Sequence, residues 1–185
     1  EKFGLDFCVV DTDYIKQLRR ERGIHANVWT SHPRLIASMD WVKSGEGLRA
    51  MRDVLPPIAG LHRKSDLLVV DEAHNIAPAA GAHYAIESLR TKFVRLISPH
   101  FQHRLFLTAT PHNGYTESFT SLLELLDDQR FARNILPDDK QLSQVMIRRL
   151  KSDLVDAEGR LLYAQRKLQA LEIQYTPEER DVHQK

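Results

Sequence analysis

Two short apolar runs stand out along the chain, Leu-Leu-Val-Val at residues 67–70 and Leu-Phe-Leu at residues 105–107. A strand that is apolar on both faces is typical of a parallel sheet covered by helices. Between the two runs, apolar residues recur at steps of three and four, which marks one face of a helix. The residues of this face are Ala82, Ile86, Leu89, Phe93 and Leu96. The order strand, helix, strand predicts a βαβ unit of an α/β fold.

The N-terminal part shows the same alternation on a smaller scale. Residues 7–10 predict a short buried strand. The polar residues 11–13 offer N-caps for a helix that is expected to end at Gly23. A second strand is expected at residues 35–38. Residues 39–58 are expected to be mostly helical, with Gly45 and Gly47 weakening the helix early and two adjacent prolines ending it.

The last third of the chain has a different texture. One more helical stripe comes before it, formed by Phe119, Leu122, Leu123 and Leu126. Beyond this stripe the sequence is mostly polar or charged, although residues 142–150 look helical and residues 171–175 alternate like a strand. We therefore predict an α/β domain at residues 1–130 and a helical, charged connector at residues 131–185, leading towards a part that this sequence does not contain.

The composition indicates an ordinary globular domain but does not indicate which molecule it binds. The 185 residues are 42% hydrophobic and 28% charged, as in ordinary globular domains. The net charge of +1 neither requires nor excludes a nucleic acid. The single cysteine, Cys8, excludes a disulfide framework and favours a reducing, cytoplasmic setting. No apolar run predicts a membrane span or a signal peptide, and the chain opens at Glu1, which suggests that the front of a longer protein is missing.

The residues directly after the first apolar run suggest chemistry. The run is followed by Asp71, Glu72, an alanine and His74. Ligands of open α/β sheets bind beyond the carboxyl ends of the strands, where these side chains are expected to lie. A carboxylate at Asp71 suits Mg²⁺, which prefers oxygen ligands and keeps several waters, and Glu72 suits the activation of an attacking water. The simpler interpretation is a solvated loop after a strand.

The second apolar run is followed by Thr108, Ala109 and Thr110. If the two predicted strands are parallel neighbours, these hydroxyls lie beside the acidic pair. There they would be able to hydrogen-bond the carboxylate or the histidine. The alternative is a plain turn closed by Pro111 and Gly114. A polar run after each of the two predicted strands arises by chance much less often than one such run alone.

These residues resemble two motifs of a known protein superfamily. Residues 67–74 look like motif II, the Walker B element, of superfamily-two helicases, and residues 105–111 look like their motif III. The resemblance implies a partial RecA-like lobe, in which a parallel sheet is flanked by helices. It also implies that Asp71 and Glu72 serve Mg²⁺ and ATP hydrolysis, with His74, Thr108 and Thr110 as coupling residues.

Further segments resemble the Swi/Snf-type branch of this superfamily, especially its RapA-like and DISARM-type members. The similar segments are residues 34–43, 108–119, 122–127 and 145–151. Such proteins use two RecA-like lobes and ATP hydrolysis to move along double-stranded DNA. The resemblance implies DNA contacts at Ser38, His112, Asn113, Arg148 and Arg149. The alternative, from the residues alone, is that the two arginines simply pair with Asp153 and Asp156.

One element of a complete nucleotide site is absent from the sequence. The phosphate-binding loop G-x-x-x-x-G-K-[ST] does not occur, and the nearest candidate, at residues 60–65, has Arg63 where glycine is required. We therefore expect a piece of a longer motor ATPase that needs the remainder of its polypeptide. A site without the phosphate loop lacks most of the stabilisation of the transferring phosphate, so the chain alone is expected to be inactive.

Two other functions stay open at this point. One is a non-catalytic module that keeps the lobe to bind DNA or protein. The other is a lobe of an RNA helicase or of a restriction-system motor from the same superfamily. A phosphate loop upstream and an arginine motif downstream would favour the motor, whereas stimulation by RNA rather than duplex DNA would favour the RNA helicase.

Overall fold

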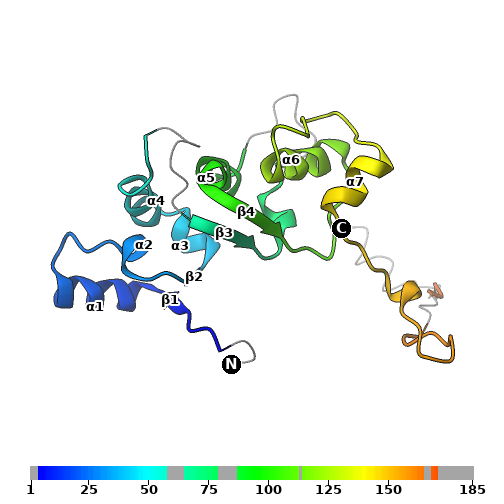
Figure 1. The fold of residues 1–185 in the computed structure, drawn as a ribbon, viewed down its shortest axis with the longest axis horizontal. Coiled ribbons are helices and arrows are strands. Elements are labelled where there is room, and N and C mark those ends of the chain that lie inside the picture. The colour runs from blue at the N-terminus through cyan, green and yellow to red at the C-terminus, as the bar shows by residue number, and fades with distance from the viewer. Residues whose placement is uncertain (1–3, 58–64, 79–86, 113, 165–167, 171–185) are drawn as a thin grey trace, which may run out of the picture. The chain divides into compact units, whose positions relative to one another are not determined.

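The computed structural model describes residues 4–57, 65–78, 87–112, 114–164 and 168–170. The chain divides into two compact units, Glu1–Pro137 and Asp138–Lys185. The first unit is α/β, with short parallel sheets flanked by helices, as the sequence predicts for a partial RecA-like lobe (Figure 1). The division of the chain into a domain at residues 1–130 and a connector at residues 131–185 stays a prediction.

The first sheet pairs β1 (Cys8–Val10) with β2 (Leu35–Ala37) in parallel, which confirms both predicted strands. Helix α1 (Thr12–Arg22) and the short α2 (Val28–Ser31) connect them. The carboxylate of Asp11 caps α1 by accepting a hydrogen bond from the backbone of Tyr14, and Gly23 ends the helix with a positive φ of 93°. This half of the unit packs around its own small core, formed by Val10, Ile15, Leu18 and Val28.

The segment after β2 is less continuous than the sequence predicts. It forms two helices, α3 (Met39–Val42) and α4 (Gly45–Arg52), and its last predicted residue lies outside the described part. Ser44 causes the interruption, because its hydroxyl accepts a hydrogen bond from the backbone of Gly47 and so begins a new helix. The two helices pack closely here: a Cβ on Gly47 would lie 2.5 Å from the carbonyl oxygen of Trp41.

The second sheet confirms the predicted βαβ unit. Strands β3 (Ser65–Val70) and β4 (Phe101–Phe106) are parallel, and Val70 pairs with Phe106. Helix α5 (Leu89–Ile97) and the 3-10 helix η2 (Ser98–His100) precede β4. The N-terminal part of the predicted helix, with Ala82 and Ile86, lies outside the described residues.

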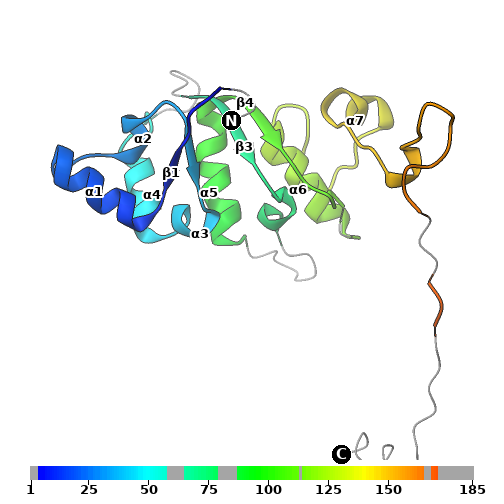
Figure 2. The same cartoon turned by 90° about the horizontal axis from the view of Figure 1, so that it is seen from below.

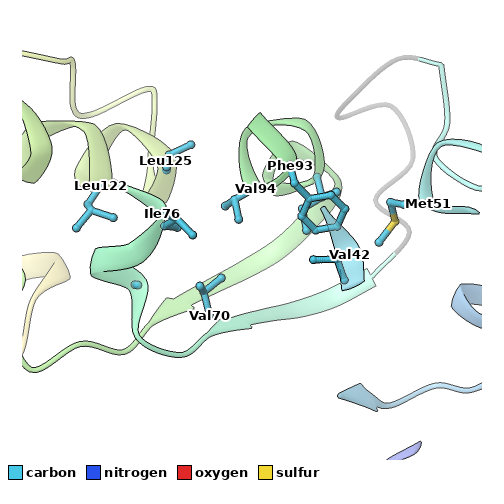
Figure 3. Packing of buried hydrophobic residues seen from close by; sticks show 10 residues of the cluster. Val42, Met51, Val70, Ile76, Phe93, Val94, Leu122 and Leu125 are labelled. Carbon is cyan, nitrogen blue, oxygen red and sulfur yellow. The ribbon is translucent and has the colours of Figure 1, made fainter. Parts of the chain in front are cut away.

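The main core lies between this sheet and helices α5 and α6 (Thr116–Leu126). Figure 3 shows Val70 of β3 pointing towards Val94 of α5 and Ile76, with Leu122 and Leu125 of α6 beside them. Phe93 packs at the other end of the same core, near Val42 and Met51. The face of β3 that carries Leu68 and Val70 is thus buried, as expected for a strand in a layered α/β fold.

The opposite face of the second sheet is exposed among the described residues. Leu67 is 53% exposed, and Val69 and Leu105 are similarly accessible. Among the described residues, helices α5 and α6 lie on one side of the two strands, so they cover only one face of this sheet (Figures 1 and 3). The residues facing away form an apolar surface, which we call the open face.

The chain remains packed on the first unit for several residues beyond α6. Phe131 is buried, and the backbone N–H of Asn134 donates to the Thr120 hydroxyl over 2.9 Å. Arg133 pairs with Glu87 at 2.8 Å and with Glu124 at 3.4 Å, and Arg95 of α5 bridges the same two carboxylates. We call these four side chains the ionic cluster.

The second unit has little regular structure in its described residues. Helix α7 (Asp139–Val145) ends earlier than the predicted residue 150, because the backbone becomes extended at Met146. A short 3-10 helix, η3 (Lys151–Asp153), and an antiparallel bridge from Val155 to Leu161 follow it (Figure 2). The predicted strand at residues 171–175 lies outside the described part. None of the described helices is both long and apolar enough to cross a membrane.

Candidate functional site

The carboxyl ends of β3 and β4 bring the two polar runs together. The backbone N–H of Leu107 donates to the carbonyl of Val70, and that of Ala73 donates to the carbonyl of Leu107, each over 2.9 Å. The parallel ladder therefore continues beyond both strands. Because the segments that follow β3 and β4 leave the sheet side by side, the acidic residues after β3 lie next to the threonines after β4. This is the juxtaposition that the sequence predicts.

The acidic pair occupies a sharp turn. Glu72 has φ 48° and ψ 47°, the left-handed conformation that a residue with a side chain rarely adopts. The carboxylate Oδ1 of Asp71 accepts a hydrogen bond from the Glu72 backbone N–H over 2.9 Å, which stabilises the turn. The next residues form a 3-10 helix, η1 (Ala73–Ile76), whose apolar residues Ala73 and Ile76 are buried.

His74 connects the two runs through one ring nitrogen. Its Nδ1 lies 3.1 Å from the Thr108 hydroxyl and 3.2 Å from a carboxylate oxygen of Glu72. The Thr108 hydroxyl also accepts a hydrogen bond from the backbone N–H of Thr110 over 3.1 Å. An Nδ1 that carries a proton donates to either neighbour, whereas an unprotonated Nδ1 accepts from the threonine. The three side chains thus form a polar group at the sheet edge.

The candidate DNA-binding residues of the first unit lie elsewhere. Ser38 follows β2, where its hydroxyl accepts a hydrogen bond from the backbone of Trp41 and so caps α3. It lines a shallow pocket of about 400 Å³ at the ends of β1 and β2, together with Asp11 and Thr12. His112 accepts a hydrogen bond from the backbone of Gly114 and lies against Phe119. Asn113 lies outside the described residues.

Arg148 and Arg149 belong to the second unit and are exposed, in a segment that forms neither helix nor strand. The carboxylates that the alternative assigns to them have other partners. Asp156 pairs with Arg160 at 3.0 Å, and Asp153 accepts a hydrogen bond from the backbone of Leu150. In the part of the chain that the structure describes, no ion pair is found for either arginine, so their charge faces solvent.

The acidic residues at the sheet edge suit a cation whose other ligands are phosphate oxygens and waters rather than protein side chains. No three His, Cys, Asp or Glu side chains of the described residues converge to enclose a metal ion. Mg²⁺ in nucleotide sites is held by one or two carboxylates together with phosphate oxygens and waters. Asp71, exposed at the edge of the sheet, fits that sparse kind of ligation.

Sequence reasoning did not single out two buried hydroxyls beneath this group. The side chain of Thr91 in α5 donates to the carbonyl of Ile76, and that of Ser118 in α6 donates to the carbonyl of Pro78. Both residues are almost fully buried. The only signal in the sequence is a small hydroxyl residue on an otherwise apolar helix, and that pattern is too common to indicate a role.

Comparisons with known proteins find relatives of this chain but no matching family model. The chain is 32% identical over 134 residues to the RNA polymerase-associated protein RapA of Actinobacillus pleuropneumoniae serotype 5b, strain L20, and equally to that of serotype 7, strain AP76. It is 30% identical to the protein of the same name from Actinobacillus succinogenes.

These alignments cover 70% of the chain but only 12–13% of each relative. The chain is therefore similar to a small part of proteins that carry the name RNA polymerase-associated protein RapA. This similarity supports the resemblance to RapA-like proteins drawn from the motifs.

Proposed function

We propose that this chain is part of the first motor lobe of a Swi/Snf-type, DNA-dependent ATPase. The observation that supports this most is the contact of His74 with both Glu72 and Thr108, because it joins the two motif-like runs across neighbouring strand ends. The low-identity relatives add support for the family. Hydrolysis of ATP by the intact protein, and its movement along double-stranded DNA, are the activities proposed.

In this proposal each side chain of the group has a separate role. Asp71 would hold Mg²⁺, in part through water, and the bound cation would supply charge neutralisation at the ATP phosphates. Glu72 orients and deprotonates the water that attacks the terminal phosphate. His74, Thr108 and Thr110 couple the state of the nucleotide to the neighbouring strand, since they connect β3 to β4. Ser38, His112, Asn113, Arg148 and Arg149 are the proposed DNA contacts.

The remainder of the polypeptide is the first proposed partner. The chain spans about 13% of the length of its first relatives, and it contains no phosphate-binding loop. The open face, with Leu67, Val69 and Leu105, supports an additional layer in the intact protein. We therefore propose that the 185 residues alone do not hydrolyse ATP. RNA polymerase, which the relatives' name associates with them, is a second proposed partner.

The test uses the intact polypeptide that contains these residues. Glu72→Gln keeps the size of the side chain and removes the base, so the rate constant kcat for DNA-stimulated ATP hydrolysis is expected to fall by about 10²–10⁴-fold. Glu21→Gln is the matched control, because Glu21 is exposed on α1 and hydrogen-bonds only its helix neighbour Gln17 among the described residues. This variant should keep the parent rate.

Two outcomes would favour other functions. Equal rates for Glu72→Gln and the parent protein would contradict the catalytic assignment and favour a binding module. Stimulation by RNA and not by duplex DNA would favour an RNA helicase. Turnover by the 185-residue chain alone, if abolished by Glu72→Gln, would contradict the proposal that the chain is inactive by itself.

A further inference from the structure

The 3-10 helix η1, which carries His74, is held from below by two side chains of distant helices. The Thr91 hydroxyl donates to the carbonyl of Ile76 over 2.8 Å, and the Ser118 hydroxyl donates to the carbonyl of Pro78 over 3.0 Å. Thr91 is 0% exposed and Ser118 is 1% exposed. The two bonds therefore form in a region without solvent, where each hydroxyl would otherwise lose its hydrogen bond to water.

The bond made by Thr91 has a defined direction. A carbonyl only accepts, so the single proton of the Thr91 hydroxyl points to Ile76. The Ser88 hydroxyl, 2.9 Å away, must then donate to Thr91, while its oxygen caps α5 by accepting from the backbone of Thr91. The cap of α5 and the support of η1 thus belong to one oriented chain of hydrogen bonds.

This support bears on the strained turn at Glu72. A left-handed non-glycine residue costs on the order of 1–3 kcal/mol and persists only where its surroundings determine the conformation. On the upstream side, the carbonyl of Val70 accepts a hydrogen bond from the backbone N–H of Leu107, just beyond the neighbouring strand. On the downstream side, Thr91 and Ser118 fix the carbonyls of Ile76, the last residue of η1, and of Pro78. The segment that carries Glu72 and His74 is therefore anchored at both ends.

We propose that Thr91 and Ser118 are positioning residues of the acidic site. The catalytic consequence of this proposal rests on the proposed function. Among the described residues, neither side chain hydrogen-bonds Asp71, Glu72 or His74. Each holds the backbone of residues 76–78, and this backbone sets where the His74 ring meets Glu72 and Thr108. Loss of either hydroxyl should loosen η1 and move the imidazole away from its two partners.

The first test measures amide hydrogen exchange in the 185-residue chain. Thr91→Val removes the hydroxyl at nearly constant volume, and we expect exchange of the Asn75 and Ala77 amides, which bond within the η1 turn, to rise about tenfold. Thr91→Ser keeps the hydroxyl and should restore slow exchange. Ser118→Ala provides an independent variant with the same expected result, should Thr91→Val fail to fold.

Thr120→Val is the matched control. Thr120 is another fully buried hydroxyl residue, but it bonds the carbonyls of Thr116 and Glu117 and accepts from Asn134. The Thr120→Val variant should speed exchange of the Asn134 amide and leave exchange of the Asn75 and Ala77 amides unchanged. If Thr91→Val and Thr120→Val affect the η1 amides equally, or if neither does, the positioning role is overturned.

The second test uses the intact protein and separates this proposal from the proposed function. Thr91→Val should lower kcat for ATP hydrolysis while leaving KM nearly unchanged, and Thr91→Ser should restore kcat. If Glu72→Gln has no effect on hydrolysis while exchange at η1 still responds to Thr91→Val, the proposed function fails and the structural support stands. A normal kcat in a Thr91→Val protein with loosened η1 would overturn the catalytic consequence alone.

Discussion

The two units of the chain keep their shape by different means. In the first, helices α5 and α6 bury apolar side chains in a core shared with β3, and this core includes Ile76, Phe93 and Leu122. In the second, no described residue is buried, and Ile147 is 91% exposed. The acidic group is built on the first kind of structure. Geometry that must be held within narrow limits is found where packing determines it from several directions.

Local polar contacts take the place of a core in the second unit. The carboxylate of Asp138 caps α7, and Gln141 returns a hydrogen bond to the cap. Farther on, one oxygen of Asp156 accepts from the backbones of Glu158 and Arg160, and Gly159 adopts a positive φ of 79°. Such contacts involve residues within a few positions of one another. They define turns, but they do not join distant parts of a chain.

The largest expected effect tests the role of burial. Phe93→Ala should lower the free energy of unfolding of the first unit by about 3–5 kcal/mol, because it removes a large ring from the core and leaves a cavity. Urea unfolding followed by circular dichroism measures this. Ile147→Ala is the control in the second unit and should change stability by less than about 0.5 kcal/mol. Similar losses for the two variants would contradict the distinction between the units.

A smaller effect is expected from the ionic cluster and depends on pH. Burial alone would raise the pKa of Glu87, but the hydrogen bond from Arg133 and the charges of Arg95 and Arg133 outweigh it and hold this pKa below its ordinary value of 4.5. The stabilisation is therefore present above pH 4.5 and is lost as pH falls through the lower pKa of the folded state.

Glu87→Gln should consequently lower the urea midpoint at pH 7 and make little difference once the parent carboxylate is protonated. Measurements from pH 7 to pH 3 on both proteins provide the comparison. Glu158→Gln is the control, because Glu158 is exposed in the second unit and pairs there only with Arg160 in the described part. A difference that does not shrink towards low pH would show that the charge of Glu87 is not its source.

The smallest effect concerns local order in the second unit. Asp138→Ala removes the capping box of α7 and should destabilise that helix by about 1 kcal/mol. Faster amide exchange within α7 would report the loss, and exchange in β3 and β4 should stay unchanged. Asp139→Ala removes a carboxylate of the first turn but keeps the cap at Asp138, so it should have a weaker effect. Faster exchange in the first unit would contradict its independence of this cap.

The sequence predicts those features that depend on periodicity. The apolar runs before Asp71 and Thr108, with a helical stripe between them, are sufficient to predict parallel neighbours and hence the meeting of the two polar runs. Ser44 also shows where this kind of prediction ends. The sequence predicts a mostly helical segment that is weakened at Gly45 and Gly47, but it does not predict that the hydroxyl of Ser44 begins a new helix there.

The parts that sequence does not predict depend on contacts between distant residues. Thr91 and Ser118 look like any small polar residue on a buried helix, and only the tertiary structure shows which carbonyls they meet. The exposure of Leu67 is a second example. Its sequence context indicates a strand apolar on both faces, but the described helices cover one of them.

The left-handed backbone at Glu72 has an evolutionary consequence. Glycine or asparagine would relieve strain on the order of 1 kcal/mol at this position, so selection for folding alone favours replacing the glutamate. With the catalytic role proposed for Glu72, selection for that role would retain the glutamate in spite of the strain. In a descendant without this role, glycine or asparagine would be expected at residue 72 while the fold is kept.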